Sequence, residues 1–122
     1  MSANILTVDD SASIRLTTKV TLTNAGYSVT EAADGAEGLA TAKSSSFDLI
    51  VTDLNMPVMD GLTMIEELRK LPGQDGVPII FLTTESDADL KARAKAAGAT
   101  GWLTKPFDPE NLVKIVKKVL GR

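Results

Sequence analysis

Residues 48–61 read DLIVTDLNMPVMDG, an apolar run that leads directly to a carboxylate. Leu49, Ile50 and Val51 show no alternation with polar residues, which is typical of a strand with both faces buried in a parallel sheet. Asp53 comes almost immediately after this run, where its carboxylate loses solvation that a surface loop would have preserved. The stretch therefore predicts a buried strand that carries a charged group at its end.

Strand patterns alternate with helix patterns on both sides of this stretch. Short apolar or alternating segments predict strands at Asn4–Val8, Tyr27–Ala32, Leu49–Thr52, Pro78–Leu82 and Gly101–Thr104. Longer segments with an apolar stripe, a capping residue or a glycine stop predict helices at Ser13–Asn24, Gly35–Lys43, Thr63–Leu71, Ala88–Ala97 and Pro109–Leu120. This alternation predicts an α/β fold in which helices cover both faces of a five-stranded parallel sheet. A chain of 122 residues has the size of one such unit, so residues 1–122 are expected to form a single domain.

The composition limits the chemistry that the chain can perform. There is no cysteine, which excludes a disulfide framework and a thiolate metal site and agrees with a cytoplasmic location. There is no histidine either, so nucleophilic, acid–base and metal-binding roles would fall to carboxylates, lysines and hydroxyls. The formal net charge of -3 disfavours nucleic acid as a partner. No apolar run approaches the ~20 residues that span a bilayer, so membrane insertion is not expected.

Polar side chains follow the predicted strands at the points where the strands end. In doubly wound sheets these carboxyl ends meet at one edge, and ligands bind there. The residues concerned are Asp9 and Asp10, Ala33 and Asp34, Asp53, Thr83 and Thr84, and Lys105 and Pro106. Each signal alone is more typical of a helix cap, a turn or a solvated side chain, but their conjunction favours a functional site.

Three of these residues, Asp9, Asp10 and Asp53, would bring carboxylates together. Clustered carboxylates repel one another and raise each other's pKa unless they share a cation. Oxygen ligands without histidine or cysteine favour a hard ion, and a few carboxylates with retained waters suit Mg²⁺ better than Ca²⁺. With one divalent ion and Lys105, the formal charges of the three carboxylates sum to zero. The sequence therefore predicts a Mg²⁺ site at these residues, with Lys105 beside it.

These residues, together with the stretch Asp53–Gly61 and the run Lys105-Pro106-Phe107, resemble the receiver domain of two-component response regulators. The resemblance covers essentially the whole chain, and the single-domain length is most similar to the CheY-like chemotaxis regulators. It implies a doubly wound, flavodoxin-like sheet in the order 2-1-3-4-5 with five helices.

The resemblance implies that Asp53 accepts a phosphoryl group from a phosphohistidine on a sensor histidine kinase. Asp10, Asp53 and the backbone carbonyl of Asn55 would bind Mg²⁺ directly, and Asp9 would act largely through water. Lys105 would contact Asp53 and then the phosphoryl oxygens. Phosphoryl transfer needs alignment and charge neutralisation more than covalent help from the protein, so this set of residues suits the reaction.

The same resemblance assigns a switch and a set of tuning residues. Thr83 would swing its hydroxyl toward the phosphoryl group. Trp102 occupies the position where receivers carry a tyrosine or phenylalanine that couples to this threonine, although from the residues alone it is more typical of a core or rim aromatic. Asn55 and Glu85 sit at positions that tune dephosphorylation in relatives. Thr84 stands where a smaller alanine or glycine is common, so it is a further tuning residue that would hinder access of water or a phosphodonor to Asp53.

The resemblance thus implies a stand-alone response regulator that changes its affinity for a downstream partner after Mg²⁺-dependent phosphorylation, in chemotaxis-type signalling. The implied partners are a CheA-like sensor histidine kinase, a target such as the flagellar motor switch, and a phosphatase. The chain is expected to be a cytoplasmic monomer. It is not expected to be an enzyme, apart from catalysing its own phosphorylation and dephosphorylation. Because no DNA-binding domain is attached, direct transcriptional control is not expected.

Several alternatives remain open at this point. On the same fold, the chain could be a phosphorelay intermediate or a phosphate sink for a histidine kinase. A Mg²⁺-dependent phosphatase resembling the haloacid dehalogenase family would need a second aspartate two residues after Asp53, where this chain has Asn55. A flavodoxin-like cofactor binder would need a hydroxyl- or glycine-rich phosphate loop after the first strand, where Asp9 and Asp10 would repel phosphate.

Overall fold

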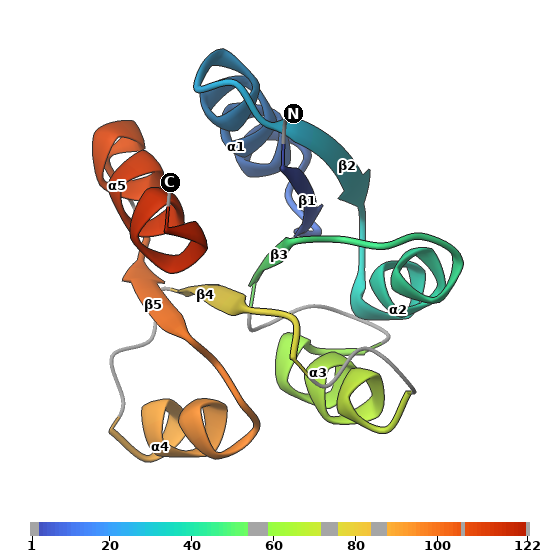
Figure 1. Cartoon of the computed structure of the whole chain (residues 1–122). Coiled ribbons are helices and arrows are strands. Elements are labelled where there is room, and N and C mark those ends of the chain that lie inside the picture. The colour runs from blue at the N-terminus through green and yellow to red at the C-terminus, as the bar shows by residue number, and fades with distance from the viewer. Residues whose placement is uncertain (1–2, 54–58, 72–75, 84–87, 106, 122) are drawn as a thin grey trace.

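The computed structural model describes residues 3–53, 59–71, 76–83, 88–105 and 107–121 (Figure 1). The strands are β1 (Asn4–Val8), β2 (Ser28–Ala32), β3 (Leu49–Asp53), β4 (Ile79–Thr83) and β5 (Gly101–Thr104). They form one parallel sheet in the order β2-β1-β3-β4-β5. The strand order implied by the resemblance is therefore confirmed, and β3 lies at the centre of the sheet.

In the described part of the chain, four helices connect successive strands, because parallel neighbours need a crossover segment between them, and a fifth helix follows the last strand. The helices are α1 (Ala12–Asn24), α2 (Gly35–Ser44), α3 (Gly61–Arg69), α4 (Ala88–Ala96) and α5 (Pro109–Leu120). Figure 1 shows α1 and α5 on one face of the sheet and α2, α3 and α4 on the other, as the doubly wound prediction requires. Among the described helices, none combines the length and the apolar character that crossing a membrane requires.

The central strand β3 is buried along its whole length and contributes to both halves of the core. Leu49 and Val51 pack in the cluster that contains Leu112 of α5, and Ile50 packs on the opposite face in the cluster that contains Leu62 of α3. Each fully buried aliphatic side chain of this kind stabilises the fold by about 2 kcal/mol. The continuous apolar run of β3 is thus explained by helices on both sides of the sheet.

Two strands extend one residue further than predicted. Asp53 and Thr83 are the last residues of β3 and β4, not the first residues after them. The sheet register continues through both, because Asp53 pairs with Leu82 and Thr83 pairs with Thr104. The main chain at these two candidate site residues is therefore held by the sheet itself.

Helix α3 also differs from the prediction, which placed it at Thr63–Leu71. It begins at Gly61 because the carboxylate of Asp60 accepts a hydrogen bond from the main-chain N–H of Thr63 at 2.8 Å and caps the first turn. It ends at Arg69. The earlier start brings the first residue of α3 against the end of β3, next to the candidate site.

Candidate functional site

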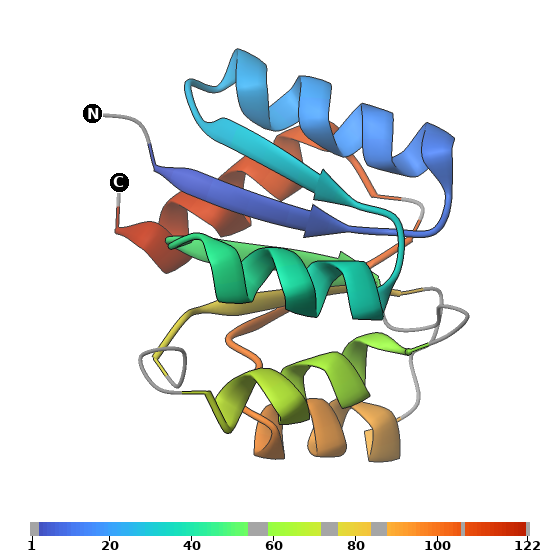
Figure 2. The same ribbon diagram turned by 90° about the vertical axis from the view of Figure 1, so that its right-hand side faces the viewer.

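Asp9, Asp10 and Asp53 converge at the carboxyl edge of the sheet. Asp9 and Asp10 follow β1 and Asp53 ends β3, and these two strands are hydrogen-bonded neighbours. In Figure 2 the arrowheads of β1 and β2 point toward this same edge. One carboxylate oxygen from each aspartate lies within 4.8 Å of the others. Asp9 and Asp53 are buried, whereas Asp10 is exposed, so the cluster can be reached from solvent on one side.

Lys105 joins this cluster from the end of β5. Its Nζ donates to Oδ2 of Asp9 at 2.9 Å and lies 3.3 Å from Oδ1 of Asp53. Only 9% of the lysine side chain is exposed, so the two ion pairs are shielded from water. The main-chain N–H of Lys105 donates to the carbonyl oxygen of Thr83 at 2.7 Å, which fixes where the lysine leaves the sheet.

Asp53 has a strongly perturbed carboxyl group. Burial raises its pKa from 3.8 to about 6, and the negative charges of Asp9 and Asp10 add to this rise. The ammonium group of Lys105 opposes it through its charge and a hydrogen bond. A single lysine therefore does not restore the ordinary pKa of Asp53.

The charges and ligand types of this cluster fit a divalent metal ion. Three carboxylates and one ammonium group leave a formal charge of two negative units, which one divalent cation would balance. The available donors are carboxylate oxygens, which suit Mg²⁺. The exposed side of the cluster would leave room for the water ligands that Mg²⁺ usually retains. Asp9, Asp10 and Asp53 could therefore hold Mg²⁺, as the sequence predicts.

Two further residues shape the cluster and were not singled out from the sequence. A Cβ atom on Gly61 would collide with the main-chain carbonyl oxygen of Asp53, so only glycine permits this approach of α3. Arg15 of α1 donates from Nη1 to the main-chain carbonyl oxygen of Asp9 at 2.7 Å. The Asp60-Gly61 pair was a usable sequence signal for a close approach of the main chain at Gly61. The Arg15 contact has no local sequence signature.

Thr83 and Trp102, the predicted switch pair, lie on neighbouring strands. Thr83 is fully buried, and Trp102 pairs in register with Phe81, two residues before Thr83. Side chains two residues apart on a strand share a face, so Thr83, Phe81 and Trp102 lie on the same face of the sheet. The rings of Phe81 and Trp102 are 6.0 Å apart at an interplanar angle of 57°.

The indole group of Trp102 is held between the core and a lysine. Lys91 Nζ lies 5.7 Å from the centroid of the indole, within the range of a cation–π contact. The buried Nε1 of Trp102 finds no hydrogen-bond partner within the described part of the chain. Whether Trp102 couples to Thr83 stays a prediction. The remaining predicted site residues, Asn55, Thr84 and Glu85, lie outside the described residues, as does Pro106.

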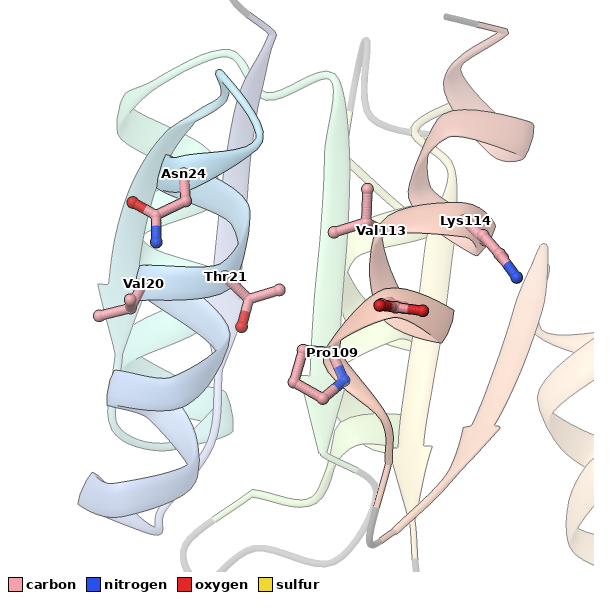
Figure 3. A pocket seen from close by; sticks show the side chains of 7 residues that line it. Val20, Thr21, Asn24, Pro109, Val113 and Lys114 are labelled. Carbon is pink, nitrogen blue, oxygen red and sulfur yellow. The ribbon is translucent and has the colours of Figure 1, made fainter.

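A separate pocket of about 460 Å³ lies between α1 and α5 (Figure 3). Its lining residues are Val20, Thr21, Asn24, Pro109, Glu110, Val113 and Lys114. Figure 3 shows Val20, Thr21 and Asn24 on α1 and Pro109, Val113 and Lys114 on α5, so both helices contribute lining residues. None of the three clustered carboxylates lines this pocket, and neither does Lys105, so it is not part of the carboxylate site.

Comparison with known proteins gives a consistent picture. The chain matches the family model described as "Response regulator receiver domain" over residues 5–117. It is similar to the solved structure of the chemotaxis protein CheY4 of Vibrio cholerae, with 48% identity and a TM-score of 0.94 over 98% of this chain and 99% of that chain. It is also similar to the receiver domain of the sensor histidine kinase PA1611 of Pseudomonas aeruginosa PAO1, with 30% identity and a TM-score of 0.91 over 100% of both chains. That structure has a magnesium ion coordinated in the active site cleft.

Curated relatives point to a broader set of roles. The probable transcriptional regulator ycf27 of Porphyridium aerugineum is 42% identical over 97% of this chain and 48% of its own length. The chain spans about half the length of the curated relatives that it matches most strongly. Any functional argument from these relatives therefore concerns only the half of their length that this chain matches.

Proposed function

Because the chain belongs to the receiver-domain family of two-component response regulators, we propose that it is phosphorylated on Asp53 by a sensor histidine kinase and then binds a downstream protein differently. The observation that carries this proposal is the position of the Asp53 carboxylate. It is buried at the end of β3, contacts Lys105 and lies beside two further carboxylates. Receivers act between histidine kinases and effectors, so this one residue would connect the two.

Asp53 would act as the nucleophile of the transfer. One of its carboxylate oxygens forms a bond to phosphorus while the phosphorus–nitrogen bond of the phosphohistidine breaks, and the electron pair of that bond leaves with the imidazole. A pKa of about 6 leaves Asp53 mostly ionised at neutral pH, as a nucleophile must be. Its burial means that little solvation has to be removed before the attack.

The residues around Asp53 would supply charge and orientation. Asp9, Asp10 and Asp53 would hold Mg²⁺, which when bound neutralises and orients the phosphoryl oxygens. Lys105 already contacts Asp53, and its ammonium group would then contact the negatively charged oxygens of the new phosphoryl group. The chain would catalyse only its own phosphorylation and dephosphorylation.

The modification would change the local charge that the fold has to accommodate. An aspartyl phosphate carries about one negative unit more than the carboxylate it replaces. Thr83, at the end of the neighbouring strand β4, would turn its hydroxyl toward the new acceptor oxygens. Trp102 lies on the same face and would transmit this movement to a partner surface around α4, β5 and α5.

The proposal is tested by measuring intact mass after brief exposure to acetyl phosphate, with and without Mg²⁺. The parent should gain one phosphoryl group only when Mg²⁺ is present. The Asp53→Asn variant, which keeps the shape of the side chain, should gain none. A folded parent without any adduct under rapid quench would overturn the proposal, and an adduct that persists in Asp53→Asn would assign it to another residue.

Chemotaxis-type signalling is the circuit that we favour, in the cytoplasm and with a CheA-like kinase. The support is the 48% identity to CheY4 over nearly the full length of both chains. This choice of circuit is tested by measuring phosphoryl transfer to this protein from each purified histidine kinase of its own organism. The transfer rates are compared at short times. The chemotaxis kinase should give the fastest transfer, and clear preference for another kinase would reject this circuit while leaving the receiver chemistry intact.

A phosphorelay intermediate is the second candidate, because the chain is also similar to receiver domains of sensor histidine kinases. Such an intermediate passes its phosphoryl group on to a second histidine protein. Rapid loss of the aspartyl phosphate when a histidine phosphotransfer domain is added would favour this role. A loss rate unchanged by that domain would favour a terminal regulator.

A further inference from the structure

Arg15 contacts the main chain that carries two of the clustered carboxylates. It lies in the first turns of α1, and 22% of its side chain is exposed. Its Nη1 donates to the main-chain carbonyl oxygen of Asp9 at 2.7 Å. This is a short, charge-assisted hydrogen bond to a residue of the proposed metal site, made by a side chain that is not itself a metal ligand.

The carbonyl that Arg15 holds belongs to the peptide between Asp9 and Asp10. A peptide unit is planar, so the direction of this carbonyl fixes how the chain leaves Asp9 and enters Asp10. The rest of Asp9 is also held: its N–H donates to Ala32 O at 3.1 Å, and its Oδ1 accepts from the N–H of Ser11 at 2.9 Å. The exposed Asp10 depends more on its main chain for its position, and Arg15 fixes the peptide that precedes it.

Glu31 of β2 holds the guanidinium group of Arg15 in place. Its Oε1 lies 3.7 Å from Nε of Arg15, and its Oε2 lies 3.6 Å from Nζ of Lys19. Glu31 therefore orients Arg15 and offsets part of its positive charge. Lys19 shares the same carboxylate but makes no hydrogen bond or ion pair with Asp9 within the described part of the chain, so it provides a matched control.

We propose that Arg15 is a positioning residue for the metal site: it fixes the Asp9–Asp10 peptide so that the carboxylate of Asp10 stays within reach of the carboxylates of Asp9 and Asp53. The inference rests on the proposed Mg²⁺-dependent function and adds a residue to it. Arg15 acts through the main chain of Asp9 and does not touch the reacting atoms.

Positioning and simple electrostatics predict opposite results when the arginine is removed. A cation near three carboxylates repels a divalent ion, so by charge alone Arg15→Met should bind Mg²⁺ more tightly than the parent. If Arg15 positions Asp10, the same variant should bind Mg²⁺ about tenfold more weakly, the lower end of what partners of metal ligands contribute. The sign of the change therefore distinguishes the two explanations.

The experiment is a calorimetric titration with Mg²⁺ of the full chain and three variants. Arg15→Met should weaken binding about tenfold, Arg15→Lys should weaken it less because one donor remains, and Lys19→Met should stay within about twofold of the parent. Phosphorylation by acetyl phosphate should fall in Arg15→Met at low Mg²⁺ and recover at saturating Mg²⁺. Circular dichroism in EDTA establishes that each variant is folded.

Parent-like or tighter Mg²⁺ binding by folded Arg15→Met overturns the inference, and so does an equal weakening in Lys19→Met. If Arg15→Met does not fold, Arg15→Lys carries the test, because it keeps the positive charge and charge alone then predicts no change in Mg²⁺ binding. A folded Arg15→Lys that binds Mg²⁺ as tightly as the parent then overturns the inference. A parent that binds no Mg²⁺ overturns the proposed function as well, whereas a parent that binds it normally confines any failure to Arg15.

Discussion

Nζ of Lys105 lies 3.3 Å from Oδ1 of Asp53 at the edge of the sheet, and the same nitrogen donates to Asp9. One ammonium group thus serves two buried carboxylates before any phosphoryl group arrives. This arrangement places a cation where the negative charge of the transferred group would develop.

The variant Lys105→Met should therefore be phosphorylated about 100-fold more slowly than the parent, because it lacks the cation that stabilises the phosphoryl oxygens. The initial rate with acetyl phosphate at saturating Mg²⁺ measures this effect. Lys91→Met, which removes a lysine near Trp102 instead, is the control and should keep nearly the parent rate. Comparable rates for Lys105→Met and the parent would contradict the role given to this lysine.

The raised pKa of Asp53 predicts a pH dependence of stability in Mg²⁺-free protein. The folded state holds the proton of Asp53 up to about pH 6, whereas an unfolded chain releases it near 3.8. The contribution of Asp53 is therefore fully present below the unfolded pKa, and it is lost as pH rises through the folded pKa. Asp53→Asn cannot ionise and should be more stable than the parent at neutral pH by about 3 kcal/mol.

Urea unfolding in EDTA at a series of pH values tests this prediction. The difference in unfolding free energy between Asp53→Asn and the parent should grow between about pH 4 and about pH 6 and then level off. Glu66→Gln, which neutralises an exposed carboxylate of α3, should follow the parent curve. A difference that stays constant with pH would mean that burial does not perturb Asp53 in this way.

The close approach of Gly61 to Asp53 predicts a specific sensitivity to an added methyl group. Gly61→Ala should destabilise the fold by about 1–3 kcal/mol, because the methyl group would collide with the carbonyl oxygen of Asp53. Gly76→Ala is the matched control, since a Cβ there meets nothing within 4 Å, and it should be neutral or slightly stabilising. Thermal unfolding of both variants measures the difference, and equal melting temperatures would argue against the tight contact.

Trp102 offers a direct readout of the predicted switch. It is the only tryptophan of the chain, so its fluorescence reports one site. Phosphorylation should shift or quench this emission in the parent, because the indole packs on the same face as Thr83. Thr83→Ala should be phosphorylated but show a much smaller change, and Asp53→Asn should show none. A full emission change in Thr83→Ala would show that Trp102 responds to phosphorylation independently of Thr83.

Much of the fold could be predicted because its signals are local. The apolar run of β3 and the alternation of strands and helices indicated a parallel sheet, and the resemblance supplied the strand order. The start of α3 was missed because Asp60-Gly61 also has the composition of a turn, and the capping hydrogen bond to Thr63 is a property of the folded chain. Local patterns thus located the elements well and their ends less well.

The carboxylate cluster of the candidate site could be predicted from the sequence, but the Arg15 contact and the pKa of Asp53 could not. The strand ends indicated that Asp9, Asp10 and Asp53 would meet, since parallel strands end at one edge. The contact of Arg15 with the carbonyl of Asp9 depends on how α1 packs against β1, which no spacing in the sequence reveals. The pKa of Asp53 likewise depends on burial, a property of the whole fold.

The hydrogen bond from the main-chain N–H of Lys105 to the main-chain carbonyl of Thr83 has a consequence for how such a signalling protein can vary. Because it involves no side-chain atom, any residue except proline at position 105, and any residue at position 83, leaves its donor and acceptor in place. The hydroxyl group of Thr83 can therefore be replaced without moving the ammonium group of Lys105. Mutation at position 83 can thus alter the predicted switch while Lys105 keeps its place beside the carboxylate cluster.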